Sequence, residues 1–203
     1  MRFSELLTKL QLSITNSEIE DFEISSIEID SRKCGENSIF FAVKGENSNG
    51  ESFINSAIEN GAKAVFSSLK SDNKNHIKVA SPYTTLADCC EIFYSEIPEN
   101  IYAVTGTNGK TSVANLTAKI LSNSGVKSAS IGTLGVLIDG DFDKKMDNHG
   151  LTTPDIITLY KTLSALKKED INDVCIEASS HGLKQGRLGN LKFKSAAFIN
   201  ITQ

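Results

Sequence analysis

The chain has 203 residues, of which 39% are hydrophobic and 23% are charged. These values are typical of a globular protein with one large domain or two small ones. The 21 Lys and Arg residues against 25 Asp and Glu residues give a formal net charge of −4. This mild acidity argues against a nucleic-acid partner bound by general phosphate neutralisation, so any anion site must be local.

The N-terminus and the cysteines indicate the compartment. Residues 1–12 lack the continuous apolar core of a signal peptide, and no run reaches membrane-spanning length. The cysteines show no CxxC and no metal-ligand spacing, so we expect buried free thiols at Cys34, Cys89, Cys90 and Cys175. Together these features predict a cytoplasmic protein with no membrane partner.

Strands and helices alternate along the first half of the chain. The pattern predicts helices at residues 3–12, 52–60 and 84–97, and strands at residues 24–29, 39–43, 64–66 and 77–79. Pro98-Glu99-Asn100 forms a natural boundary, so residues 1–98 are expected to be an α/β unit. His76 and His149 have no partner at ligand spacing and are expected at the surface.

The strongest motif lies between Ile101 and Gly125. A short apolar strand at 101–104 runs into the turn Thr105-Gly106-Thr107-Asn108-Gly109, and Lys110-Thr111 opens a helix that ends before Gly125. Along this helix one face of a 3.6-residue period is formed by Val113, Leu116, Ile120 and Leu121.

This strand, turn and helix predict a phosphate-binding loop. Backbone N–H groups at the helix start and the positive end of the helix dipole attract a polyphosphate, and Gly106 and Gly109 let the backbone approach it. Lys110 would neutralise phosphate charge, and the Thr111 hydroxyl would ligate Mg²⁺. Val104 stands where the common pattern has its first glycine, so the loop is a variant. It predicts binding of ATP or GTP.

The remaining chain predicts further strands and one long helix. We expect strands at 128–132, 173–177 and 196–200, the last of buried type, and a hairpin leading from 134–138 through Asp139-Gly140-Asp141. Residues 143–150 are expected to form a polar loop, followed by a helix to residue 169 with Thr153 as N-cap and Pro154 first. Only three or four strands follow residue 101, whereas a parallel-sheet P-loop domain usually has more, so this domain is expected to be incomplete.

Polar side chains near the expected strand ends are candidates for chemistry. Glu177 ends an apolar strand at the same edge as the loop, where it would bind Mg²⁺ or position an attacking group, or would simply face solvent. Ser179 and His181 suggest a hydrolase nucleophile, but no G-x-S-x-G elbow surrounds them. Arg187 suits a phosphate or carboxylate but equally a surface position.

Taken together, the ordered motifs resemble the Mur ligases, which add amino acids to the UDP-linked precursor of peptidoglycan. The loop alone marks the wider superfamily, and the other motifs are similar to those of the member that adds the third amino acid. The matching stretches are 29–32, 40–45, 105–111, 151–155, 177–183 and 198–200.

The resemblance implies a fold, a reaction and cofactors. It implies a small N-terminal α/β UDP-binding domain (1–98) followed by an incomplete P-loop α/β domain (99–203), the N-terminal part of an ATP-binding central domain. The implied reaction is ATP-dependent addition of meso-diaminopimelate or L-lysine to UDP-N-acetylmuramoyl-L-Ala-D-Glu through an acyl phosphate. Mg²⁺ is the implied cofactor, ATP the co-substrate and a monomer the expected state.

The resemblance also assigns residues to roles. Lys110 and Glu177 are the implied catalytic residues, and Thr111 and Glu177 the implied Mg²⁺ ligands. The implied ATP site consists of Gly106, Thr107, Asn108, Gly109, Lys110, Thr111 and Ser112. The implied substrate-binding residues are Ser31, Thr152, Thr153, Ser179, Gln185 and Arg187.

Two departures from the family pattern qualify these expectations. Family members continue past this last strand into an Asp-His-Leu-Asp motif, a carbamylated lysine and an amino-acid-binding domain, whereas this chain stops at Gln203. We therefore expect no ligase activity from the chain alone. Glu46-Asn47 also differs from the usual residues near the uracil. The alternatives are a non-catalytic module binding a UDP-sugar or nucleotide, and a folylpolyglutamate-type ligase, which an N-terminal domain with Asp-Ser-Arg disfavours.

Overall fold

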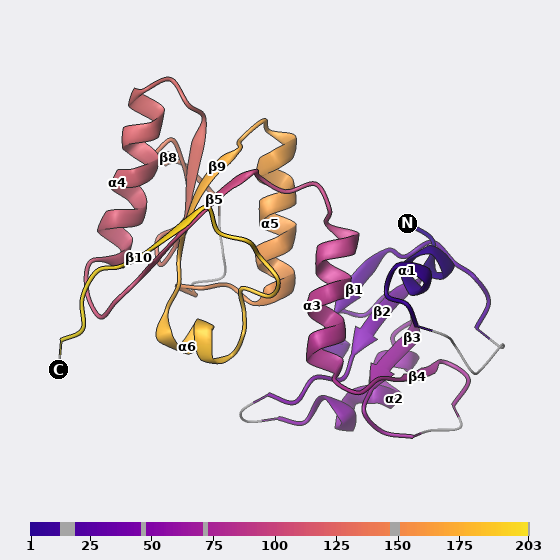
Figure 1. Ribbon diagram of the computed structural model, residues 1–203. Helices are drawn as coiled ribbons and strands as arrows, with labels where there is room; N and C mark the ends of the chain where they lie inside the picture. The colour runs from indigo at the N-terminus through magenta and orange to yellow at the C-terminus, as the bar shows by residue number, and fades with distance from the viewer. Residues whose placement is uncertain (13–18, 46–47, 71–72, 147–150, 203) are drawn as a thin grey trace. The chain divides into compact units, whose positions relative to one another are not determined.

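The computed structural model describes residues 1–12, 19–45, 48–70, 73–146 and 151–202, and all statements below concern these residues. The chain forms two compact units, unit 1 (Met1–Phe93) and unit 2 (Tyr94–Gln203) (Figure 1). Both are built from strands and helices in alternation, so the predicted α/β class is confirmed. No helix in the described ranges combines the length and apolar character needed to cross a bilayer.

Unit 1 contains a sheet of four parallel strands in the order β1-β2-β3-β4. The strands are β1 (Ser26–Glu28), β2 (Ser38–Phe41), β3 (Ala62–Ser67) and β4 (His76–Lys78). The helices are α1 (Phe3–Lys9), α2 (Ile54–Glu59), α3 (Pro82–Phe93) and two short 3₁₀ turns, η1 (Ser31–Lys33) and η2 (Gly50–Phe53).

Both faces of this sheet are buried. Successive strand residues point to opposite sides, and all four residues of β2 are buried. Phe41 stacks on Phe66 with ring centroids 4.5 Å apart, and Phe66 meets Phe3 of α1 edge-on at 6.4 Å. On the other face Phe40 packs in one cluster with Ala57 of α2. With both faces covered, the strand ends are the places where polar side chains of unit 1 can meet a ligand.

Unit 2 contains a sheet of six strands in the order β10-β5-β9-β6-β7-β8. Its first four strands are parallel, and β6, β7 and β8 pair antiparallel in succession. The strands are β5 (Asn100–Thr105), β6 (Ser128–Gly132), β7 (Gly135–Ile138), β8 (Asp141–Met146), β9 (Asp173–Glu177) and β10 (Ser195–Phe198). The helices are α4 (Lys110–Asn123), α5 (Ile156–Lys168) and α6 (Ser180–Lys184), with α4 and α5 on opposite sides of the sheet (Figure 1).

The strand order places three chain segments together at one edge of this sheet. Although β6 follows β5 in the chain, β9 lies between them in space. Glu177, the last residue of β9, is level with Val104 of β5, and Ile176 is level with Ile131 of β6. Glu177 therefore lies between the loop that follows β5 and the turn that follows β6.

The expected apolar face of α4 is wrong in two of its four positions. Leu116 and Ile120 are 58% and 64% exposed, whereas the buried residues of the helix are Ala114 and Ala118. Small side chains let the helix backbone approach the sheet closely, and Ala114 packs with Val104 of β5. The face of α4 that is buried is therefore the one with small side chains, and not the one that the apolar period predicts.

Two further expectations about unit 2 are corrected. The predicted hairpin exists, with positive φ at Asp139 and Gly140, but its return strand β8 occupies part of the region expected to be a polar loop. In the described residues five strands therefore follow β5, rather than three or four. The last strand, expected to be buried, is the edge strand β10, and its Phe198 is 63% exposed.

The cysteine prediction is confirmed, and the prediction for His76 is wrong. All four cysteines are buried and free. His76 is 5% exposed, its Nε2 lies 2.6 Å from the Ser67 hydroxyl, and burial lowers its pKa. The surface expectation failed because the first residue of β4 is covered by the rest of unit 1. His149 and the Glu46-Asn47 segment lie outside the described residues.

Candidate functional site

The loop between β5 and α4 has the backbone expected of a phosphate-binding loop. Gly106 and Gly109 adopt φ values of +149° and +84°, a region that favours glycine. Helix α4 begins directly after Gly109, and the first N–H groups of a helix have no partner within it. Together with the helix dipole, these N–H groups make the start of α4 suitable for an anion.

The Lys110 side chain folds back over this loop. Its Nζ donates to the carbonyl oxygens of Gly106 at 2.7 Å and Thr107 at 3.1 Å. The ammonium group is thereby held against the loop. A polyphosphate bound at the start of α4 would meet this positive charge, so Lys110 is placed to neutralise it.

Glu177 and Thr111 meet at the edge of the sheet. The Thr111 hydroxyl donates to Glu177 Oε2 at 2.9 Å, and Glu177 is 1% exposed. A second residue, Thr133, donates its backbone N–H to Oε1 at 2.9 Å and its hydroxyl to Oε2 at 3.2 Å. The alternative of a solvent-facing glutamate is therefore wrong, because β5 and β6 enclose the end of β9.

This donor set fits Mg²⁺. The ion prefers hard oxygen ligands and is usually bound by one or two protein oxygens together with substrate phosphates and waters. Thr111 and Glu177 offer such oxygens beside the loop. Among the described residues no group of three or more His, Cys, Asp or Glu side chains could form an all-protein metal cage. The site thus suits a metal ion that arrives with a phosphate ligand.

A second polar cluster continues from the backbone of Glu177. The Thr153 hydroxyl donates to the Glu177 carbonyl at 2.7 Å and accepts from the Ser179 N–H at 2.9 Å. Arg187 donates from Nη1 to the Thr153 carbonyl and from Nε to Gln185 Oε1, both at 2.7 Å. One hydrogen-bonded network therefore joins the predicted residues from β9 to Arg187.

Thr152 connects the two clusters. Its hydroxyl lies 3.0 Å from the Thr133 hydroxyl. Because the Thr133 hydroxyl proton points to the Glu177 carboxylate, the Thr152 hydroxyl is the donor in this contact. Both threonines of the Thr152-Thr153 pair thus face the edge of the sheet where the loop lies.

The expected capping roles of Thr153 and Pro154 are wrong. Helix α5 begins at Ile156, and its N-cap is Asp155, whose Oδ1 accepts from the Thr158 N–H at 3.1 Å. Thr153 is fully buried and points at β9 instead. Ser179 likewise is an N-cap, of α6, accepting from the Gly182 N–H at 3.0 Å. Its hydroxyl is engaged in capping, which does not support the hydrolase nucleophile that the Ser-His pair suggested.

In unit 1, Ser31 lies where β1 ends. It is buried in η1, and its carbonyl accepts from Asn60 Nδ2 at 3.0 Å. The turn is held by Asp30, whose carboxylate accepts from the Arg32 guanidinium at 2.7 Å. This hydrogen bond lowers the pKa of Asp30 to about 2. Ser31 is therefore fixed at the carboxyl edge of the sheet.

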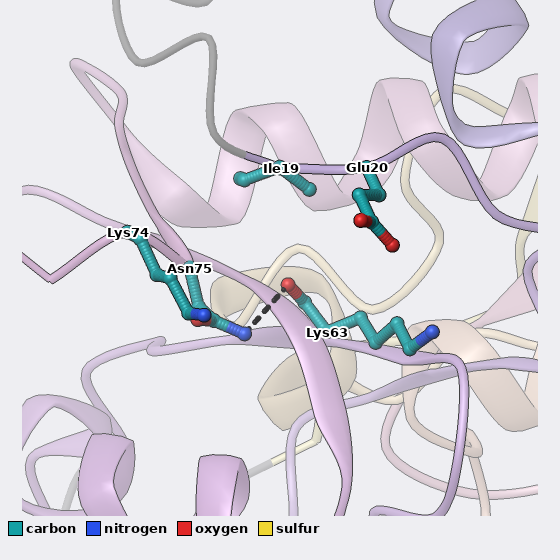
Figure 2. A pocket seen from close by; sticks show the side chains of 5 residues that line it. All are labelled: Ile19, Glu20, Lys63, Lys74 and Asn75. Carbon is teal, nitrogen blue, oxygen red and sulfur yellow. Dashed lines mark hydrogen bonds between the residues drawn. The ribbon is translucent and has the colours of Figure 1, made fainter.

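The described part of unit 1 also contains an open cavity of about 260 Å³ (Figure 2). It is lined by Ile19, Glu20, Lys63, Lys74 and Asn75. Asn75 Nδ2 donates to the Lys63 carbonyl at 3.0 Å beneath it. Lys63 lies near the start of β3, so this cavity is at the opposite edge of the sheet from Ser31 and includes none of the predicted site residues.

Two family models match the chain. The Mur ligase middle domain matches residues 104–203, and the model described as Mur ligase family, catalytic domain, matches residues 23–115. Together they cover residues 23–203, which include all of unit 2 and most of unit 1. The chain belongs to the Mur ligase family.

Two curated relatives and one solved structure carry the same name. The UDP-N-acetylmuramoyl-L-alanyl-D-glutamate--2,6-diaminopimelate ligase of Rickettsia prowazekii (strain Madrid E) is 38% identical over 194 residues, which are 93% of this chain and 40% of that protein. The ligase of the same name from Zymomonas mobilis is 39% identical over 186 residues, 91% of this chain and 37% of that protein. A solved structure with this name has a TM-score of 0.70 at 27% identity and covers 95% of this chain and 41% of that chain.

The Mur ligase chain thus spans about 40% of the length of the relatives it matches. Its structure brings together every predicted site residue of unit 2 from the loop to Arg187, while Ser31 lies in unit 1. Sequence reasoning missed Gly132 and Thr133, which shape the Glu177 position. A Cβ on Gly132 would come within 2.6 Å of Glu177 Cγ. The sequence signal that could have found them is the Gly-Thr pair at the end of the predicted strand 128–132.

Proposed function

We propose that this chain is part of an ATP-dependent ligase that adds the third amino acid to UDP-N-acetylmuramoyl-L-Ala-D-Glu in peptidoglycan synthesis. The observation that carries the proposal is the Thr111–Glu177 contact beside a phosphate-binding loop. It occurs in a chain that matches UDP-N-acetylmuramoyl-L-alanyl-D-glutamate--2,6-diaminopimelate ligases along about nine-tenths of its length. Those relatives are diaminopimelate ligases, which favours diaminopimelate over lysine as the incoming amino acid.

The nucleotide site is proposed to extend from Gly106 to Ser112. In this arrangement the N–H groups at the start of α4 bind phosphate, and Lys110 leaves its two loop carbonyls to neutralise phosphate charge. Thr111 and Glu177 would hold Mg²⁺, which when bound supplies positive charge to the transferring phosphoryl group. Thr133 keeps the Glu177 carboxylate oriented toward Thr111.

Substrate contacts are proposed separately for each unit, at the second polar cluster in unit 2 and at Ser31 in unit 1. Arg187 presents a planar cation suited to a diphosphate or carboxylate, and its contacts with Gln185 and Thr153 fix its direction. Thr152 and Ser179 add hydroxyl groups along the same edge. By the resemblance to Mur ligases, the substrate carboxylate is activated as an acyl phosphate, which the incoming amino group attacks.

We further propose that this chain binds its ligands as a monomer in the cytoplasm. Four buried free thiols are consistent with a reducing compartment. The non-catalytic binding module and the ligase share all these residues and differ only in turnover. The ligase names of the relatives do not favour a folylpolyglutamate-type reaction.

Calorimetric titration tests the proposal. UDP-N-acetylmuramoyl-dipeptide and Mg-ATP should each bind the chain. Sugar-nucleotide binding should weaken in Arg187→Ala and Ser31→Ala, and Mg-ATP binding should weaken in Lys110→Ala. Arg2→Ala and Ser52→Ala are matched controls, since both residues are exposed and lie outside the site. Binding of Mg-ATP without the sugar nucleotide would point to another P-loop enzyme, and binding of neither would reject the proposed sites.

A further inference from the structure

The segment that follows β10 lies against the phosphate-binding loop. Strand β10 pairs in parallel with β5, so that Phe198 is level with Thr105. The chain therefore leaves β10 beside the loop that leaves β5. Ile199 continues the pairing by donating its N–H to the Thr105 carbonyl at 3.0 Å. The next residue, Asn200, meets the loop itself.

Asn200 makes three hydrogen bonds to two loop residues. Its Oδ1 accepts from the Asn108 N–H at 3.1 Å, and its Nδ2 donates to the Asn108 carbonyl at 2.9 Å. Its own carbonyl accepts from the Thr107 N–H at 3.1 Å. The primary amide thus pairs with both backbone groups of Asn108, as a neighbouring strand would, in a loop that has no regular backbone pairing of its own.

Packing from the same segment limits the loop further. A Cβ on Gly106 would come within 2.6 Å of Ile199 Cγ1 and 3.1 Å of the Asn200 nitrogen. The loop at this point contains Gly106 and Gly109, and glycine loses more conformational freedom on folding than any other residue. External contacts are therefore needed to keep a single conformation.

We propose that Asn200 is a positioning residue of the nucleotide site. Its amide holds the loop so that the N–H groups at the start of α4 and the Lys110 ammonium converge on one polyphosphate. The inference rests on the proposed nucleotide binding and assigns to Asn200 no contact with the ligand. The N–H groups of Thr107 and Asn108 serve the loop conformation rather than the phosphate.

A blocking role for Asn200 would predict tighter nucleotide binding when its amide is removed, whereas a positioning role predicts weaker binding. If Asn200 merely occupied N–H groups that phosphate requires, removing its amide would free them and tighten nucleotide binding. If Asn200 positions the loop, removing the amide leaves the Asn108 carbonyl without its donor and lets the loop adopt other conformations. Binding then weakens, because part of the binding free energy is spent on ordering the loop.

The test is Asn200→Asp, which keeps the side-chain shape but replaces the donor with an oxygen. We expect the affinity of the 203-residue chain for Mg-ATP, measured by calorimetry, to fall about tenfold, as for one lost hydrogen bond. The control is Asn123→Asp, an exposed residue at the far end of α4 that undergoes the same change of charge. Asn200→Ala removes both amide atoms without adding charge, and its affinity should fall to a similar extent, also if the first variant does not fold. A loss of affinity in Asn200→Asp alone would reflect repulsion between the new carboxylate and the phosphates, and would overturn the inference.

A second measurement separates positioning from a purely structural role. In hydrogen-exchange NMR, the Asn108 amide proton should exchange faster in Asn200→Ala, which removes its Oδ1 acceptor, while protons within α5 remain protected. Faster exchange with unchanged Mg-ATP affinity would overturn the inference, as would tighter binding. If the unchanged chain binds no Mg-ATP, both the proposed nucleotide site and this inference are rejected. If the unchanged chain and Asn200→Asp bind equally, only the inference fails.

Discussion

Gly132→Ala is the substitution that most directly tests how the Glu177 site is built. Gly132 is the last residue of β6, and a Cβ there would come within 2.6 Å of Glu177 Cγ and closer still to its carboxylate. Cβ atoms essentially never approach other heavy atoms within 3.0 Å. The added methyl group must therefore displace the Glu177 side chain from its buried position.

The expected cost follows from the contacts that this displacement breaks. Glu177 accepts from the Thr111 hydroxyl and the Thr133 N–H at 2.9 Å each. Hydrogen bonds to a charged group contribute about 1.5–3 kcal/mol each. Losing both would lower the free energy of unfolding of unit 2 by roughly 3 kcal/mol or more. Mg-ATP binding should also weaken, because Thr111 and Glu177 would no longer be held together.

Urea unfolding followed by circular dichroism measures the stability change, and hydrogen-exchange mass spectrometry of β6 and β9 peptides assigns it to unit 2. Gly35→Ala is the control, since a Cβ at Gly35 has nothing within 4 Å and no positive φ is required. In a Glu177→Ala background the cost of Gly132→Ala should nearly disappear, because the clashing side chain is absent. A cost equal to that of Gly35→Ala, or one unchanged in this background, would refute the reasoning.

Three further predictions concern packing, pH and the arginine. Ala118→Leu should lower the free energy of unfolding by about 1–3 kcal/mol, because the larger side chain overpacks the face of α4 that lies against the sheet. Leu116→Gln, on the exposed face, should change it by no more than about 0.5 kcal/mol, and the opposite order in urea unfolding would show that the faces are wrongly assigned. Burial lowers the pKa of His76, so as the pH decreases below about 6.5 the unfolded state takes up a proton before the folded state does. Stability should therefore decrease as the pH is lowered, more steeply than in His76→Gln, and parallel pH profiles of the two proteins would contradict this. Arg187→Lys keeps the charge but cannot make both 2.7 Å contacts, so it should cost about 1–2 kcal/mol of stability and weaken sugar-nucleotide binding; wild-type values in both calorimetry and unfolding would argue against a bidentate role.

Local sequence was sufficient for the parts of the site that are close in the chain. The loop at residues 105–111 is a strand, a glycine turn and a helix start in succession, and its backbone requirements are visible in Gly106 and Gly109. Strand β9 was predicted with its observed bounds, because a buried parallel strand is a continuous apolar run. Glu177 could be placed at the same edge as the loop, because parallel strands share their carboxyl edge.

Residues whose role depends on partners far along the chain could not be read from local pattern. Thr153 resembles a helix cap beside Pro154, but its partners are Glu177 and Ser179, more than twenty residues away. The apolar period of α4 suggested Leu116 and Ile120, although closeness to the sheet selected the alanines.

What the sequence by itself determined is the type of each segment and the chemistry of its loop: an α/β chain with a nucleotide-binding turn and a carboxylate at the matching edge. What only the tertiary structure decided is the arrangement of that edge. Insertion of β9 between β5 and β6 puts Glu177 between Thr111 and Thr133, and the pairing of β10 with β5 brings Asn200 to the loop. Strand order is a non-local choice, made by burial of the whole sheet, and no short window of residues contains it.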